Sequence, residues 1–129
     1  AERAMMANQA GADMLLRIHA NGSEDPSASG ALALVPSAGN AYDGNLSAQS
    51  ASLAQTILDA YCRATGMANL GIQYNDTMTG INWSKQPVVI LEMGFMTNEK
   101  DDMAMADEAF RQTMAGGIAE GVEAYFKAE

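Results

Sequence analysis

The chain has 129 residues, of which 48% are hydrophobic and 18% are charged, so it can bury one core but not two. Asp and Glu number 16 against 7 Lys and Arg, and the resulting net charge of −9 argues against binding to nucleic acid. No apolar stretch approaches the ~20 residues of a membrane span, and we identify no charged-then-apolar signal peptide.

The first half of the sequence predicts a helix, two strands and a longer helix. Apolar residues run almost without interruption through each expected strand, which is typical of strands buried on both faces. Gly11 and Gly66 are in position to end the two helices. The expected elements are a helix over residues 1–10, strands over 13–19 and 31–35, and a helix over 46–65.

The second half predicts two further strands and a final helix. Alternation of side chains within residues 72–83 favours a strand with one buried face. Residues 88–93 form another continuous apolar run after Pro87, which predicts a buried strand. Strands that alternate with helices indicate an α/β fold with a mostly parallel sheet flanked by helices.

The final helix is expected to begin after Thr97 or Asn98, either of which can cap it. Acidic side chains over residues 99–108 indicate a solvated helix start. The expected core stripe recurs at four-residue spacing and consists of Phe110, Met114, Ile118 and Val122. Glycines lower the intrinsic stability of a helix, so we expect close packing at Gly116, Gly117 and Gly121.

Two expected strands carry, near their ends, residues that core packing would not select, namely His19 and Glu92. Ligands of open α/β sheets gather at the carboxyl ends of strands, so both residues are candidates for chemistry. Two structural alternatives stay open. His19 could be a hydrogen-bonded histidine at a strand end, and Glu92 could be the buried ion-pair partner of Arg17, which shares a strand face with His19.

Two longer motifs surround these residues. Residues 12–22 read ADMLLRIHANG, and residues 87–98 read PVVILEMGFMTN. The first resembles the AD-x-x-x-S-IHAN stretch and the second the P-x-x-L-x-E-x-GF-[IM]-[ST]-N signature of zinc-dependent N-acetylmuramoyl-L-alanine amidases, the amidase-3 family. Residues 79–83 and the glycines of the final helix fit the same pattern, so the resemblance runs along the whole chain in order.

This resemblance implies a zinc enzyme that hydrolyses bacterial peptidoglycan. In the family, two histidines and one glutamate hold zinc and leave a position open for water, as a catalytic zinc site requires. His19 corresponds to one zinc ligand, and Glu92 corresponds to the catalytic glutamate that takes a proton from the zinc-bound water. The implied substrate bond joins the lactyl group of N-acetylmuramic acid to the L-alanine of the stem peptide.

Three further residues are weaker candidates for binding substrate. Asn21 follows His19 and could orient it, although a turn-forming role explains an asparagine at this position equally well. Asn82 and Trp83 precede the strand of Glu92 and could border the substrate groove, with simple packing at the sheet edge as the alternative.

The chain departs from the family in its zinc ligands. His19 is the only histidine, and the family's GHGG-type motif and glutamate ligand are missing. We therefore expect residues 1–129 to be the C-terminal portion of a catalytic domain whose first strand and helix lie outside this chain. The alternative is a metal-free relative that acts as a non-catalytic muropeptide-binding or cell-wall-binding module.

The expected partners follow from the same resemblance. Peptidoglycan is the expected substrate, and the expected location is extracellular, at the cell wall. A missing strand would leave a sheet edge that requires pairing. The edge partner is expected to be the complementary N-terminal segment of the same domain or another copy of the chain. No nucleic acid and no membrane span are expected.

Overall fold

Four strands form one mixed sheet in the computed structural model, which describes residues 1–128. The elements are α1 (Glu2–Ala10), β1 (Leu15–Asn21), β2 (Ala31–Val35), η1 (Gly44–Leu46), α2 (Ser47–Thr65), β3 (Asn69–Tyr74), α3 (Thr79–Asn82), β4 (Val88–Phe95), α4 (Glu99–Ala106) and α5 (Glu108–Ala128). The strand order is β1-β4-β2-β3. β1 pairs parallel with β4, β2 pairs parallel with β3, and the central β2–β4 pair is antiparallel. The predicted α/β class is confirmed.

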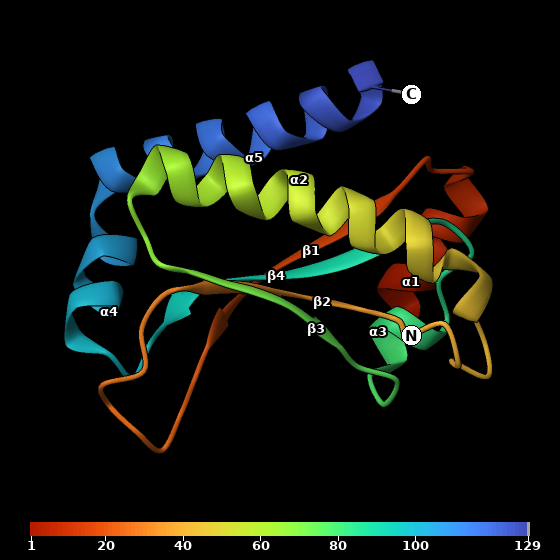
Figure 1. The fold of residues 1–129 in the computed structure, drawn as a ribbon, viewed down its shortest axis with the longest axis horizontal. Helices are drawn as coiled ribbons and strands as arrows, with labels where there is room; N and C mark the ends of the chain where they lie inside the picture. Colours follow the sequence, from red (N-terminus) through yellow and green to blue (C-terminus); the bar gives the residue numbers. More distant parts are fainter. Residues whose placement is uncertain (129) are drawn as a thin grey trace.

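The two faces of the sheet are covered unequally. α2 and α5 run side by side across one face (Figure 1). The main core lies beneath them and includes the buried Ala33, Val35, Val89 and Leu91 of the sheet. The opposite face carries the short helix α3 and a much smaller core of Ile81, Val88 and Ile90. This second face therefore has the smaller apolar core.

Helix ends follow the glycine signals in the sequence. Gly11 ends α1 with φ of 65°, and Gly66 ends α2 with φ of 74°. Both angles lie in the left-handed region that favours glycine. β2 has the predicted bounds, and α2 begins one residue later than predicted because η1 precedes it. Among residues 1–128, no helix is both long and apolar enough to cross a bilayer.

The predicted strand over residues 72–83 is wrong beyond Tyr74, and the observed strand begins earlier, at Asn69. β3 ends at Tyr74, and residues 79–82 form α3 instead. The side chain of Asn75 accepts hydrogen bonds from the backbone N–H and the hydroxyl of Thr77, at 2.9 and 3.0 Å. This local Asx turn ends the strand. Ile81 is buried while Trp83 is 54% exposed, so they do not form one buried strand face.

The predicted final helix is two helices separated by Asp107. Asn98 caps α4 by accepting a hydrogen bond from the backbone N–H of Asp101 at 3.0 Å. Asp107 has an extended backbone, and its carboxylate accepts a hydrogen bond from the N–H of Phe110 at 2.8 Å. The predicted core stripe of α5 is confirmed, because Phe110, Met114, Ile118 and Val122 all pack against the main core.

Close packing is confirmed at two of the three helix glycines. A Cβ atom on Gly121 would lie 2.6 Å from Cα of Ile57, and one on Gly117 would lie 2.9 Å from Cβ of Ala64. The neighbouring Gly116 has no heavy atom within 4 Å of its ideal Cβ position, so the expectation was wrong there. Gly117 and Gly121 therefore set how closely α5 approaches α2.

Gly121→Ala is expected to lower the free energy of unfolding by about 1–3 kcal/mol, because the methyl group meets backbone atoms of α2 that cannot rotate away. Gly116→Ala is the matched control on the same helix. It is expected to raise the free energy of unfolding by up to about 1 kcal/mol, because alanine has the higher helix propensity. Urea denaturation of both variants measures the difference, and equal effects would contradict this packing arrangement.

Candidate functional site

His19 and Glu92 lie side by side on neighbouring strands. They are direct partners in the parallel register of β1 and β4. Val89 and Leu91 point into the core beneath α2, and side chains alternate along a strand, so Glu92 faces the opposite side of the sheet. The sequence placed both residues at strand ends. The structure places them slightly before the strand ends, on the sheet face opposite α2 and α5, since β1 continues to Asn21 and β4 continues to Phe95.

The carboxylate of Glu92 is buried and incompletely hydrogen-bonded. The residue is 8% exposed, and its Oε2 atom is buried without a hydrogen-bond partner. Burial raises the pKa of Glu92, and the neighbouring His19 opposes this shift. Within residues 1–128, Glu92 forms no ion pair with Arg17, so the structural alternative considered for Glu92 is wrong.

Asn21 lies at the end of β1, two residues beyond His19. Its Oδ1 atom accepts a hydrogen bond from the backbone N–H of Gly22 at 2.9 Å. Its backbone carbonyl accepts another from the N–H of Met96 at 2.8 Å. These contacts support the turn-forming role. A direct contact between Asn21 and substrate remains a prediction.

Asn82 and Trp83 lie near the opposite end of β4. The side chain of Asn82 accepts a hydrogen bond from Asn40 Nδ2 and donates one to the carbonyl of Asp76, both at 2.9 Å. Both residues precede β4, and Glu92 is four residues beyond its first residue, a distance of roughly 13 Å along a strand. The structure does not bring Asn82 and Trp83 together with His19 and Glu92, and their role in binding remains a prediction.

The end of β4, three residues beyond Glu92, is held by Asp101, although the sequence predicts Asp101 to lie in a solvated helix start. Asp101 is 4% exposed. Its carboxylate accepts hydrogen bonds from the hydroxyl of Ser29 at 2.7 Å and from the N–H groups of Gly30 and Phe95 at 3.0 Å. It thus ties the start of β2 to the end of β4. Its position three residues after the Asn98 cap was the only sequence signal.

A second carboxyl with a shifted pKa lies away from this site. Asp43 is 2% exposed, and neither of its oxygens has a hydrogen-bond partner. Burial and the charge of Asp76 raise the pKa of Asp43 to about 6. Asp43 follows β2 and precedes α2, at the end of the sheet remote from Glu92. The sequence carried no signal for its burial.

A metal ion would require more ligands than the described residues bring together. A catalytic zinc site has three protein ligands. Within residues 1–128, no group of three or more His, Cys, Asp or Glu side chains is placed to hold a metal ion. His19 and the unpartnered oxygen of Glu92 offer one imidazole and one carboxylate, so these residues alone do not fit a complete zinc centre.

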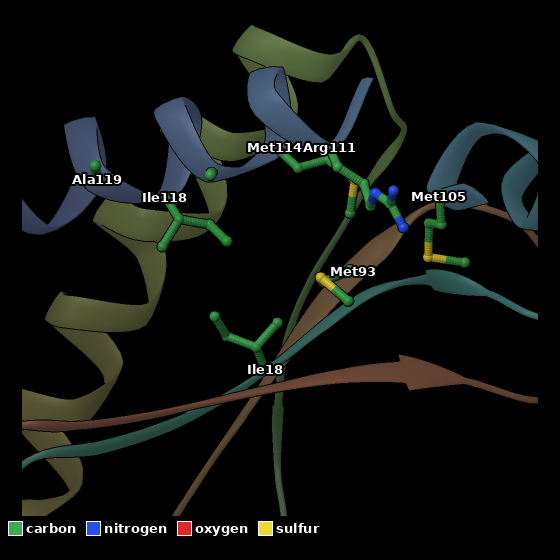
Figure 2. A pocket seen from close by; sticks show the side chains of 8 residues that line it. Ile18, Met93, Met105, Arg111, Met114, Ile118 and Ala119 are labelled. Carbon is green, nitrogen blue, oxygen red and sulfur yellow. The ribbon is translucent and has the colours of Figure 1, made fainter. Parts of the chain in front are cut away.

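An apolar hollow of about 440 Å³ lies on the other face of the sheet, beside the edge strand β1. Ile18 of β1 and Met93 of β4 point towards α5, as Figure 2 shows. Ile18 is 49% exposed. Met105, Met114 and Ile118 complete most of the lining, with Arg111 at one side. The hollow and the free edge of β1 therefore adjoin each other.

Comparisons with known proteins agree on one family. A family model described as N-acetylmuramoyl-L-alanine amidase matches residues 1–124. The chain is 31% identical over 125 residues to YqiI, an uncharacterized protein of Bacillus subtilis, covering 97% of this chain and 57% of YqiI. It is 28% identical over 127 residues to the N-acetylmuramoyl-L-alanine amidase LytC of the same organism, covering 98% of this chain and 24% of LytC.

A solved structure shares the fold across the same length. The crystal structure of N-acetylmuramoyl-L-alanine amidase from Clostridium difficile 630 matches with a TM-score of 0.85 and 27% identity. The match covers 99% of this chain and 65% of that one. The chain therefore spans less than two thirds of the length of each of these three relatives.

Proposed function

The chain belongs to the N-acetylmuramoyl-L-alanine amidase family, and from this premise we propose that its His19–Glu92 pair acts in peptidoglycan hydrolysis. The bond cleaved is the amide between the lactyl group of N-acetylmuramic acid and the L-alanine of the stem peptide. One observation carries the proposal: a buried carboxylate oxygen of Glu92 has no partner in the described residues and lies beside the only imidazole of the chain.

Glu92 is proposed as the general base and then the general acid. Burial raises the pKa of Glu92 from its usual value in the direction of neutral pH. A group whose pKa lies nearer to neutral pH can both accept and return a proton. Glu92 accepts a proton as the oxygen of water bonds to the amide carbon. It then delivers that proton to the nitrogen of L-alanine as the carbon–nitrogen bond breaks.

His19 is proposed as one ligand of a zinc ion whose other ligands lie outside the described residues. Zinc, when bound, would polarise the attacking water and the scissile carbonyl. The imidazole of His19 is held on β1, next to the proposed general base Glu92 on β4. A complementary segment of the same catalytic domain is proposed to supply the remaining ligands. Because the substrate is in the wall, the proposed place of action is extracellular, at the cell wall.

The free edge of β1 and the apolar hollow support this choice of partner. An unpaired strand edge exposes backbone groups that a further strand can satisfy. Ile18, Met93 and Ile118 offer an adjoining apolar surface for a helix or strand of the same segment. A second copy of the chain is the competing occupant, and the oligomeric state of a zinc-containing sample separates the two.

Elemental analysis of zinc against protein concentration, combined with an assay for newly released L-alanine amino groups from peptidoglycan, tests the proposal. About one zinc per chain together with hydrolysis is the expected result when the complementary segment is present. Muropeptide binding by a zinc-free sample that never hydrolyses, even with that segment, would instead indicate a non-catalytic module.

Ile18→Ser is expected to weaken zinc retention and association with the partner by about tenfold, because it removes apolar surface at the proposed contact. Leu70→Ser is the matched control on the other edge strand, β3, since the two side chains are 49% and 45% exposed. Equal loss of zinc in both variants, measured at matched thermal stability, would place the partner elsewhere.

A further inference from the structure

Arg17 is a cation without a partner in the described chain. Its Nε atom is buried and has no hydrogen-bond acceptor. The two ion pairs within residues 1–128 are Arg63–Glu120 and Lys127–Glu123, and neither involves Arg17. The side chain as a whole is half-buried, and a guanidinium nitrogen that is buried without an acceptor costs the fold free energy. An anion bound beside Arg17 would supply this acceptor.

The position of Arg17 relates it directly to the proposed catalytic pair. Arg17 precedes His19 by two residues on β1, so both side chains leave the same face of the sheet. Two residues of strand span roughly 7 Å. An extended peptide has nearly the same repeat, so a peptide whose scissile bond lies at His19 and Glu92 can place its second residue near Arg17.

The guanidinium group is held in place by packing against α3. A Cβ atom on Gly80 would overlap Nη1 of Arg17, so the absence of a side chain at this residue makes room for the guanidinium. Arg17 lines a hollow of about 320 Å³ together with Thr79 and Gly80 of α3 and with residues 1–4. The hollow gives a ligand access to the guanidinium.

We propose that Arg17 binds a carboxylate of the substrate, on the second residue of the stem peptide. The planar guanidinium can donate two parallel hydrogen bonds to a carboxylate, a geometry that an amide cannot match. This inference rests on the proposed function, since it takes His19 and Glu92 as the place of bond cleavage. It adds a determinant of specificity: the protein prefers stem peptides in which this carboxyl group is free.

The test compares two muramoyl peptides that differ only at the second stem residue, one with glutamate and one with its amide. The zinc-loaded protein is expected to show a kcat/KM about 10- to 100-fold higher for the free carboxylate. Arg17→Gln is expected to abolish this ratio by lowering kcat/KM for the acid substrate alone. Arg111→Gln, which removes a positive charge from the other face of the sheet, is expected to leave the ratio unchanged.

The Gly80→Ala variant tests the position of the Arg17 guanidinium separately from its charge. The added methyl group displaces the guanidinium, which is the flexible end of its side chain, while the net charge stays the same. The preference for the acid substrate is expected to fall at least tenfold in this variant as well. Equal kcat/KM for both substrates in the unmodified protein would overturn the proposal. It would also be overturned if Arg17→Gln lowered zinc content or stability and left the ratio intact, since the carboxylate would then belong to the polypeptide.

A binding measurement distinguishes failure of this inference from failure of the proposed function. If neither substrate is hydrolysed even with the complementary segment present, the proposed function fails, and titration of the chain with the dipeptides L-Ala-D-Glu and L-Ala-D-isoglutamine decides the inference. Binding of L-Ala-D-Glu at least tenfold tighter than of its amide, lost in Arg17→Gln, would support it. Equal affinity for the two dipeptides would overturn it.

Discussion

Replacing Glu92 by Gln is expected to lower the rate of amide hydrolysis by about 100- to 10,000-fold, the range typical for loss of a general base. The amide has the same shape as the carboxylate but cannot accept a proton from water. Zinc content is expected to remain unchanged, because Glu92 is proposed as the base and not as a ligand. Steady-state kinetics of the zinc-loaded protein, with zinc measured on the same sample, gives both quantities.

Asp43→Asn is the matched control for this substitution. Asp43 is also a buried carboxyl without hydrogen-bond partners, but it lies at the other end of the sheet. Its neutral isostere is expected to leave the rate within a factor of about two, since the site gains and loses no contact. Unchanged activity in Glu92→Gln would remove the role assigned to Glu92, and equal losses in both variants would point to a general effect of removing buried charge.

His19→Ala is expected to weaken zinc retention by at least about 100-fold. Loss of a group that only supports a ligand costs 10–100-fold in affinity, and loss of a ligand costs at least as much. Hydrolysis is expected to fall with zinc occupancy. Equilibrium dialysis against a zinc-buffered solution, followed by elemental analysis, measures the change.

Asn21→Ala serves as the control on the same strand. Its side chain binds the N–H of Gly22, so the substitution disturbs the turn after β1 without removing an imidazole. Zinc retention is expected to stay within about threefold of the unmodified protein. Unaltered zinc content in His19→Ala would exclude His19 from the ligand set, whatever the effect on hydrolysis.

The two strands that carry His19 and Glu92 could be predicted because apolar residues run through them almost without interruption. His19 and Glu92 were recognised for the same reason, as polar residues within those runs. The strand prediction failed over residues 75–83 because a period of two over a few residues also arises in a turn followed by one helical turn. The side chain of Asn75 favours the turn through its hydrogen bonds to Thr77, and a hydrophobic pattern does not reveal such bonds.

The burial of Asp101 and the placement of Arg17 could not be predicted from the sequence. Asp101 is buried because Ser29 and Gly30 approach it from a distant part of the chain. Arg17 reaches its position because Gly80 leaves space in α3. Each case depends on two segments that meet only in the folded molecule, so neither segment alone carries the signal.

The buried carboxyl group of Asp43 makes the fold itself sensitive to acidity. Its pKa is raised from its usual 3.8 to about 6, so the folded chain holds this proton more tightly than the unfolded chain does. The contribution of Asp43 to stability is therefore fully present below pH 4 and is lost as the pH rises through 6. At neutral pH the folded chain retains a desolvated negative charge on Asp43, and mild acidification neutralises this charge by protonation. Release of the Asp43 proton between pH 4 and pH 6 is thus coupled to a lower free energy of unfolding.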